Sequence, residues 1–341
     1  MDISEASCHH AIVLSTTTLD SDAWEKLSEQ LTAVLIEALL AVGISTSSGH
    51  DTRHERRFLD NAKSVLDIQI TVLSSSGLDL QQCHVVLSRP GVKALEQNWD
   101  VEVVLLPSGL SQGLHTRPGL AVFDMDSTLI QQEVIDELAR AVNKYDAVAK
   151  ITEEAMRGEL DFEQSLGKRV ALLEGVPTSI WDQLKASTIT FTPGAHELVG
   201  CLKALGWKTA VLSGGFVPLA QWVKGQLGLD YAYANVLLTN QEGTHLTGKL
   251  DPKAPIVHAK RKKQLLQKLA ADNDIPSQNV IAIGDGSNDL LMMRVAGLGI
   301  AFNAKLSVQE RAPMRMNRHS LLDIMYVLGH TEDEVKRLLV I

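Results

Sequence analysis

Four short, mostly apolar runs mark the later part of the chain, and none of them alternates with polar positions. They cover residues 120–123, 209–212, 280–283 and 298–302, and stretches with helical spacing lie between them. A strand with one face in water alternates apolar and polar residues, whereas a strand covered on both faces does not. The pattern therefore predicts an α/β unit, a Rossmann-like three-layer parallel sheet.

Residues 131–187 contain no strand pattern, only amphipathic helical spacing. Because this block falls between the first and second predicted sheet strands, we expect it to form its own helical cap. Residues 107–118 are rich in Gly, Ser and Pro, which is typical of an interdomain linker.

The first hundred residues have a different pattern. Residues 11–16 form an apolar strand candidate, and a helix follows in which Asp22 and Glu25 have capping-box spacing and which Gly43 ends. Alternation predicts two further strands at 66–72 and 101–105, and residues 79–97 are partly helical but interrupted at Pro90 and Gly91. Residues 49–57 are polar and predict a loop.

This order of strands and helices resembles the small α+β modules called ACT domains, which often bind amino acids. The resemblance implies a regulatory or dimerisation unit over residues 1–112, and a homodimer is one consequence. The turn at 16–22 lacks the glycine that this family often has there.

Composition narrows the class of protein. The chain has 341 residues, 45% of them hydrophobic, and a formal net charge of −9. Nucleic-acid binding needs basic surfaces, so a nucleic-acid partner is not expected. No stretch is long enough to predict a membrane span, and three widely spaced cysteines fit a reducing compartment. We expect a soluble, cytoplasmic protein.

Polar residues follow three of the four apolar runs. Asp124 and Asp126 follow the first, Ser213 with Gly214 and Gly215 the second, and the segment from Gly284 to Asp289 the third. The carboxyl ends of parallel strands meet at one edge of a sheet, so these groups should lie together. Two buried acids this close require a cation or a proton on one of them.

These endings resemble the motifs of the haloacid dehalogenase superfamily, whose phosphatases use an aspartate nucleophile. Within it, the chain is most similar to the phosphoserine phosphatase family, because Glu133 follows the first motif and Phe162-Glu163-Gln164-Ser165-Leu166-Gly167-Lys168-Arg169-Val170 and Leu212-Ser213-Gly214-Gly215-Phe216 match as well. The resemblance implies hydrolysis of O-phosphoserine, the last step of serine biosynthesis by the phosphorylated route. It places the catalytic core at 113–133 and 188–341 and the helical cap at 134–187.

The resemblance also implies a Mg²⁺ cofactor. Its ligands would be the side chains of Asp124 and Asp285 and the backbone carbonyl of Asp126, while Asp289 fixes their geometry from behind. Such hard oxygen donors are those that Mg²⁺ prefers. Asp124 would attack phosphorus, and Asp126 would protonate the leaving oxygen and later activate water.

A phosphate cradle and a substrate pocket complete the expected site. Ser213, Gly214, Gly215, Asn288 and a lysine would hold the phosphoryl oxygens. Lys262 fits that lysine by its spacing from the helix that follows, although Lys260 and Lys263 remain alternatives. Glu133 would accept the substrate ammonium and Arg169 would bind its carboxylate. Met156 and Phe162 would shield the pocket, or serve only as core packing.

Two other functions remain open from the sequence. One is the same chemistry on another small phosphate monoester. The other is an amino-acid-sensing protein with residual phosphatase activity, against which the intact acidic motifs argue.

Overall fold

The computed structural model describes residues 6–46, 56–73 and 78–340. It divides into two compact units. The first comprises Met1–Pro118, Pro313–Arg318 and Leu322–Ile341, and the second comprises Gly119–Ala312 and His319–Leu321. The sequence boundaries left residues 313–341 with the catalytic core, whereas the contacts group most of them with the first unit.

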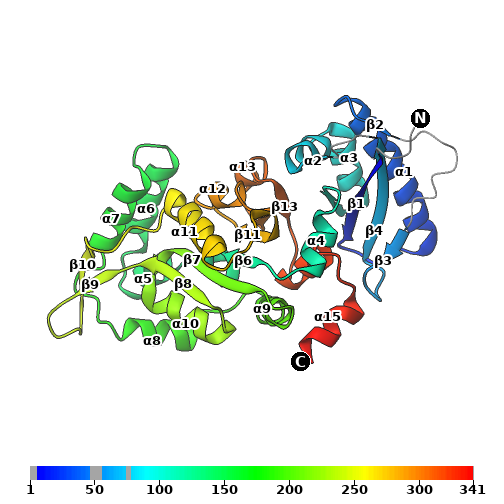
Figure 1. Ribbon diagram of the computed structural model, residues 1–341. Coiled ribbons are helices and arrows are strands. Elements are labelled where there is room, and N and C mark those ends of the chain that lie inside the picture. The colour runs from blue at the N-terminus through cyan, green and yellow to red at the C-terminus, as the bar shows by residue number, and fades with distance from the viewer. Residues whose placement is uncertain (1–5, 47–55, 74–77, 341) are drawn as a thin grey trace. The chain divides into compact units, whose positions relative to one another are not determined.

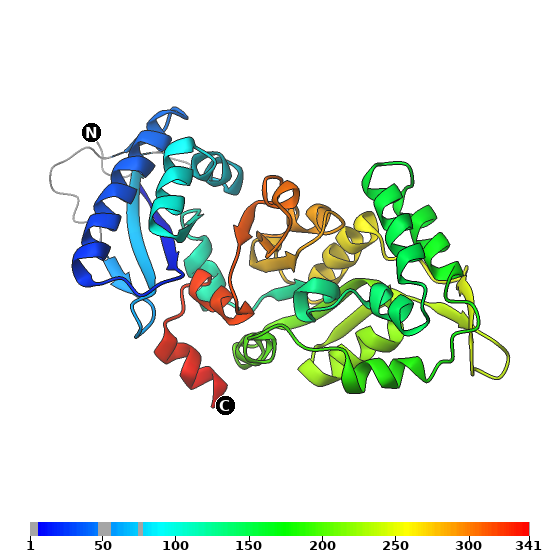
Figure 2. The ribbon, with the colours of Figure 1, turned by 180° about the vertical axis from the view of Figure 1, so that it is seen from behind.

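The first unit contains an antiparallel sheet with helices on one face. Its strands are β1 (Ala6–Ser15), β2 (Ser45–Thr46), β3 (Arg56–Phe58), β4 (Val65–Leu73) and β5 (Val101–Leu106), in the order β2-β4-β1-β5 with β3 also paired to β4. Figure 2 shows α1 (Ser21–Leu40) and α3 (Pro90–Trp99) lying in front of β1 and β4. Alternate strand residues such as Ala11, Val13 and Ile68 pack with Leu27 and Leu31 of α1 in one core.

Several local expectations for this unit need correction. The N-cap of α1 is Asp20, which accepts a hydrogen bond from the Ala23 amide, rather than Asp22. Residues 79–97 form two helices, α2 (Leu80–Leu87) and α3, because Pro90 takes the first position of a new helix, where its missing N–H costs nothing. Residues 47–55 of the expected loop 49–57 lie outside the described residues, and Arg56 and Arg57 belong to β3.

The expected linker contains α4 (Leu110–Thr116), which belongs to the first unit. The chain returns to this unit with β13 (Met314–Met316), α14 (Ile324–Val327) and α15 (Glu332–Leu339). Polar contacts hold the returning segment: Arg315 Nη2 lies 2.6 Å from Glu96 Oε1, and the Asn317 amide donates to Glu102 Oε2 at 2.7 Å. These partners are far apart in the sequence, so no local pattern indicated the return.

The second unit is built on parallel strands in the order β12-β11-β6-β7-β8. Their bounds are β6 (Leu120–Phe123), β7 (Lys208–Phe216), β8 (Tyr231–Asn235), β11 (Val280–Gly284) and β12 (Leu298–Phe302). The four continuous apolar runs are thus confirmed as buried strands of an α/β sheet. Strand β8 was not predicted, because its tyrosines are only partly buried and break the apolar run.

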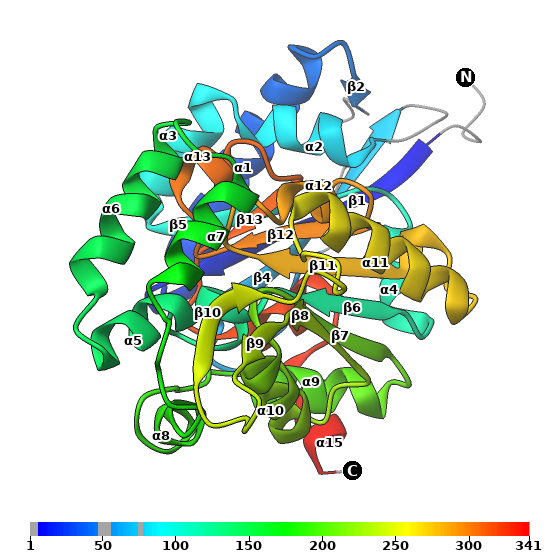
Figure 3. The same ribbon diagram turned by 90° about the vertical axis from the view of Figure 1, so that its left-hand side faces the viewer.

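Helices cover both faces of this sheet. Figure 3 shows α11 (Ala259–Asp272) and α12 (Leu290–Met293) on one side of the strands and α9 (Ala195–Ala204) and α10 (Val217–Leu227) on the other. Leu120 and Val122 of β6 pack with Leu265 and Leu266 of α11 in a single core. Burial on both faces explains why the strands carry no polar alternation.

A helical cap is inserted after β6, as expected. It consists of α5 (Val134–Ala141), α6 (Tyr145–Met156), α7 (Phe162–Ala171) and α8 (Ile180–Ser187). Figure 1 shows α6 and α7 beside an unpredicted hairpin, β9 (Leu237–Thr239) and β10 (Leu246–Leu250). The hairpin also bonds to the chain after α7, since the Gly175 amide donates to Leu246 O at 2.9 Å.

The two chain crossings between cap and core run side by side. Ile130 and Phe191 form an isolated antiparallel bridge, and the Gln131 amide donates to Thr190 O at 3.0 Å. The Gln132 side chain reinforces this pairing, accepting from the Thr190 amide at 2.9 Å and donating to its hydroxyl at 2.8 Å. We call residues 130–132 and 189–192 the cap hinge.

Among the described residues, no helix combines the length and apolar character that crossing a lipid bilayer requires.

Candidate active site

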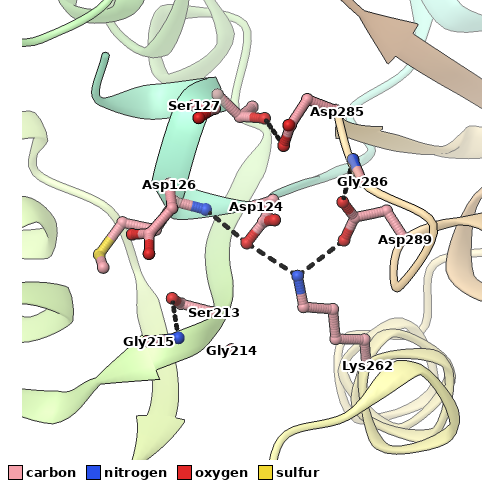
Figure 4. Close-up of polar contacts among 12 residues, drawn as sticks. Asp124, Asp126, Ser127, Ser213, Gly214, Gly215, Lys262, Asp285, Gly286 and Asp289 are labelled. Atoms are coloured by element: carbon pink, nitrogen blue, oxygen red, sulfur yellow. Dashed lines mark hydrogen bonds and ion pairs between the residues drawn. The ribbon is translucent and has the colours of Figure 1, made fainter. Parts of the chain in front are cut away.

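Asp124 stands at the carboxyl end of β6, where the strand opens into a turn. Its amide donates to Ile283 O at 2.9 Å, which continues the pairing with β11, and its Oδ1 accepts from the Met125 amide at 2.7 Å. A wide helical turn follows over Met125–Leu129, in which Ser127 has a φ of 55°. A non-glycine residue in this left-handed region is strained and is often found at functional sites. Figure 4 shows Asp124 at the centre of the acidic group.

Lys262 of α11 is completely buried between two carboxylates. Its Nζ lies 2.7 Å from Asp124 Oδ1 and 2.7 Å from Asp289 Oδ1 (Figure 4). Burial alone would lower the pKa of Lys262, but the two carboxylates outweigh it and raise the pKa above its usual value. The amine is therefore charged at neutral pH. Of the lysines that the sequence left open, Lys260 is exposed and Lys263 is half-buried.

Asp126 is a half-buried acid with one unused oxygen. Its Oδ2 accepts from the Val134 amide at 3.3 Å, whereas its Oδ1 is buried with no hydrogen-bond partner among the described residues. Burial, together with the charges of Glu133 and Asp124, raises the pKa of Asp126 well above that of a free aspartate. The raised pKa favours the protonated form of Asp126, which can donate a proton.

Residues 213–215, near the end of β7 where its pairing with β8 is irregular, are called the Ser213 loop and present their backbone beside these acids. The Ser213 hydroxyl accepts from the Gly215 amide at 2.8 Å. A β-carbon on Gly215 would lie 3.0 Å from Ser213 Oγ and 3.3 Å from Asp126 Oδ2, so a side chain would crowd the site. Gly214 O accepts from Asn235 Nδ2 at 2.7 Å, and Asn235 Oδ1 accepts from the Val257 amide at 2.8 Å.

Asn235 is a residue that the sequence reasoning missed. It is buried at the end of β8 and ties the Ser213 loop to the segment that precedes α11. Recognising β8 as a strand would have placed a polar residue at a fourth carboxyl end. That is the one signal the sequence offered.

The loop that follows β11 brings Asp285, Asn288 and Asp289 to the same site. Asp289 Oδ2 accepts from the Gly286 amide at 3.1 Å. Gly284 and Gly286 have no room for a β-carbon, which would collide with Asp289 and Asn288 respectively. Asn288 Nδ2 lies 3.9 Å from the β-carbon position of Gly214, so it reaches toward the Ser213 loop.

Asp124, Asp285 and Asp289 can place one carboxylate oxygen each within 4.8 Å of the other two. Burial, and then the charges of Asp124 and Glu133, raise the pKa of Asp285 to about 7. With all three carboxyl groups ionised, the single charge of Lys262 would leave negative charge uncompensated. Hard oxygen donors with uncompensated charge fit a divalent cation such as Mg²⁺.

Four residues expected to contact substrate, Glu133, Met156, Phe162 and Arg169, lie in the cap or at its start. Glu133 Oε1 accepts from the Ser127 hydroxyl at 2.7 Å, at the start of the cap. The side chain of Glu133 is partly exposed to solvent. Desolvation of its carboxyl group nevertheless raises the pKa of Glu133, and the charge of Asp124 raises it further. Phe162 of α7 lies over the Ser213 loop, since its Cζ is 3.4 Å from the β-carbon position of Gly214. The side chain of Met156 lies outside the described residues.

Arg169 of α7 is half-buried, and its Nε donates to Ser165 O at 3.3 Å. Burial lowers the pKa of Arg169, and the charges of Asp136, Glu133 and Asp126 oppose this. Arg169 therefore lies within electrostatic range of these three acids. Asp136, on the first turn of α5, is a second residue that the sequence reasoning did not single out.

Comparisons with known proteins show which family this chain is similar to. The family model of haloacid dehalogenase-like hydrolases matches residues 121–294. A phosphoserine phosphatase from Idiomarina loihiensis is 50% identical over 214 residues, which cover 63% of this chain and 95% of that protein.

Two solved structures are also similar. A phospho-aspartyl intermediate analogue of phosphoserine phosphatase is 40% identical with a TM-score of 0.56, covering 62% of this chain and 99% of that one. A HAD family hydrolase from Salmonella enterica subsp. enterica serovar Typhi is 29% identical with a TM-score of 0.71. The match covers 94% of this chain and 98% of that one, so it includes the first unit.

Proposed function

The chain belongs to the haloacid dehalogenase-like hydrolases and, within them, to the phosphoserine phosphatases, and we propose that it hydrolyses O-phosphoserine to serine and phosphate. The observation that carries the proposal is the pairing of two acids in different surroundings. Asp124 is bound by the charged Lys262, whereas Asp126, two positions later, has a raised pKa and a buried oxygen without a hydrogen-bond partner among the described residues. This pair supplies a nucleophile and a proton donor.

We infer that Asp124 attacks the phosphorus atom of the substrate. A bond forms between a carboxylate oxygen of Asp124 and phosphorus, the bond from phosphorus to the serine oxygen breaks, and the Asp126 proton goes to that oxygen. The product is an aspartyl-phosphate and free serine. Splitting the hydrolysis in this way replaces one difficult step by two easier ones.

Water then releases the phosphate. Asp126, now a carboxylate, takes a proton from a water molecule whose oxygen bonds to phosphorus, and the bond from phosphorus to Asp124 breaks. Asp126 is thereby returned to its protonated state. Its raised pKa suits both directions of this transfer, because burial disfavours the charged form.

The residues that would hold Mg²⁺ are Asp124 and Asp285, with Asp289 bound to Lys262 behind them. A bound Mg²⁺ would neutralise charge between the phosphate dianion and the nucleophile. Lys262, Ser213 and the Gly215 amide would contact the phosphoryl oxygens, over which charge spreads during the reaction, and fixed donors of this kind favour the transition state.

Selection of the amino acid is proposed for the cap. Glu133 would pair with the ammonium group and Arg169 with the carboxylate, while Phe162 covers the Ser213 loop and limits access of water. The conclusion is a cytoplasmic enzyme of serine biosynthesis. A sugar phosphate would lack both of the charged groups that Glu133 and Arg169 are proposed to bind.

Two variants test this function. Asp124→Asn should lose turnover by roughly 10⁴-fold or more while melting normally, and beryllium fluoride should label Asp124 of the unaltered protein in a Mg²⁺-dependent way. Arg169→Ala should lower kcat/KM for phosphoserine by roughly 10- to 100-fold but leave that for an aryl phosphate almost unchanged. Equal losses of kcat/KM on both substrates would contradict the proposal that the cap selects the amino acid.

For the first unit we propose an ACT-like regulatory or dimerisation role. Because the unit includes the C-terminal segments 313–318 and 322–341, serine binding is best measured on the full chain. Calorimetry on the Arg169→Ala variant would separate a regulatory site from product binding in the active site. No heat of binding in this variant would leave dimerisation, measured by sedimentation, as the remaining role.

A further inference from the structure

His330 is a buried histidine in the first unit that the catalytic site does not use. It is 3% exposed and lies between α14 and α15. Gly329, with a φ of 90°, ends α14, and the His330 amide donates to Met325 O at 3.0 Å. This helix-ending motif fixes the backbone of His330.

The ring nitrogens of His330 have no hydrogen bond among the described residues. Nε2 is buried without a partner, and Nδ1 lies 3.9 Å from Glu334 Oε2, which is longer than a hydrogen bond. Buried polar atoms in proteins are almost always satisfied. The position therefore points to a partner that is not a protein side chain.

A second histidine and a carboxylate gather around His330. The ring of His115, from α4, stacks on that of His330 with centroids 4.1 Å apart and an interplanar angle of 26°. Glu334 is fixed by a capping box, in which its Oε2 accepts from the Thr331 amide at 2.8 Å. One ligand atom from each of His115, His330 and Glu334 can lie within 4.8 Å of the other two.

Two imidazoles and one carboxylate are a typical ligand set for zinc, whereas Mg²⁺ prefers oxygen donors alone. We propose that His115, His330 and Glu334 bind a Zn²⁺ ion, with water as the fourth ligand. Lone pairs lie in the ring planes, so the two stacked rings must turn relative to each other to share an ion. His115 is half-buried, whereas His330 is buried.

The consequence of this site is structural. His115 precedes the catalytic unit in the sequence, whereas His330 and Glu334 follow it. One ion bound to all three would cross-link α4 to α15 and fix the C-terminal segment in the first unit. Zn²⁺ should therefore raise the melting temperature of this unit, because a ligand of the folded state stabilises it.

The test uses the full chain carrying Asp285→Asn, stripped with a chelator and then given excess Mg²⁺, so that the catalytic acids do not compete. Co²⁺ is the probe, because it substitutes for zinc and absorbs visible light in tetrahedral sites. We expect one equivalent of Co²⁺ to bind with visible bands and to be displaced by Zn²⁺. Isothermal titration gives the affinity for Zn²⁺.

Three variants separate ligands from bystanders. His115→Gln and Glu334→Gln should weaken Zn²⁺ binding by at least the roughly 10- to 100-fold that loss of an outer-shell partner costs. Glutamine also serves in a capping box, so Glu334→Gln keeps the start of α15. His319→Gln, at an exposed histidine outside the cluster, should bind Zn²⁺ unchanged.

Absence of visible Co²⁺ bands would overturn the proposal, and the two rings would then be packing partners only. Zn²⁺ affinity that is unchanged in both His115→Gln and Glu334→Gln would overturn it equally. Circular dichroism checks that each variant folds. Should His115→Gln fail to fold, Glu334→Gln alone decides, because its helix cap is preserved.

Discussion

Replacing Lys262 by methionine would remove one buried charge while nearly keeping the length of the side chain. Lys262 Nζ lies 2.7 Å from both Asp124 Oδ1 and Asp289 Oδ1, and none of the three side chains has more than slight exposure. Breaking a buried ion pair by removing one partner costs about 3–5 kcal/mol, because the remaining charge is left uncompensated. For a unit of this size that loss lowers the melting temperature by roughly 6–20 °C.

The sign of the pH dependence follows from the carboxylates. Burial raises the pKa of Asp289, and Lys262 is what opposes that rise. Without Lys262, the carboxyl pKa in the folded protein moves further above its unfolded value, so the folded state binds more protons. Stability must then fall as pH rises. The loss caused by Lys262→Met should be larger at pH 8 than at pH 5.

Calorimetry in the presence of a chelator measures this effect. The two units can melt separately, so the transition to follow is the one that Mg²⁺ shifts in the unaltered protein. Lys260→Met, at an exposed lysine in the same helix, is the matched control and should melt normally. The double variant Lys262→Met/Asp289→Asn should recover at least half of the loss, because it removes one of the unpaired carboxylates.

Turnover gives a second reading of the same variant. Loss of a donor to the developing phosphoryl charge should lower kcat by roughly 10²- to 10³-fold. Equal melting temperatures of Lys262→Met and the unaltered protein, at pH 8 without Mg²⁺, would refute the reasoning on charge compensation. No recovery in the double variant would point instead to a packing defect around the methionine.

Three other expectations follow from single features of the chain. Burial, Asp124 and Glu133 raise the pKa of Asp285 to about 7, so the unfolding free energy of chelated protein should fall between pH 4 and pH 7. Mg²⁺ should restore it above pH 7 and change it little at pH 4, and denaturant titrations showing equal effects would contradict this. Iodoacetamide should label exposed Cys8 well before Cys83, because burial raises the pKa of Cys83 to about 12; mass spectrometry with comparable rates would contradict it. Gly248→Ala should cost about 1–3 kcal/mol more than Gly243→Ala, since both have positive φ but only a β-carbon at Gly248 meets Glu174, 2.9 Å away; equal thermal shifts would refute the contact.

The sheet of the second unit was predictable because strands buried on both faces are uninterrupted apolar runs in the sequence. Strands β6, β7, β11 and β12 are continuous apolar runs, whereas β8 carries half-buried tyrosines and was missed. The hairpin β9–β10 was missed for a related reason, since most of its residues are at least partly exposed. Neither element has the apolar signal on which the prediction depended.

The acids of the site could be placed because strand order brings carboxyl ends together. Asn235 could not, because its role depends on its tertiary hydrogen bonds with Gly214 and Val257. The return of residues 313–318 and 322–341 to the first unit is likewise set by distant partners such as Glu96 and Glu102. Local patterns report which face of an element is buried, not which remote segment covers it.

The cap hinge has a mechanical consequence for specificity. The Ser127 amide donates to Gln132 O at 3.3 Å, so the strained turn after Asp124 is attached directly to the first crossing of the hinge. Glu133 is the next residue, and its carboxylate is held by the Ser127 hydroxyl. Rotation of the cap about the cap hinge would therefore move the segment that carries Asp126. The ligand recognition proposed for Glu133 would thereby be transmitted to Asp126 through the six intervening residues of continuous backbone, without a separate relay.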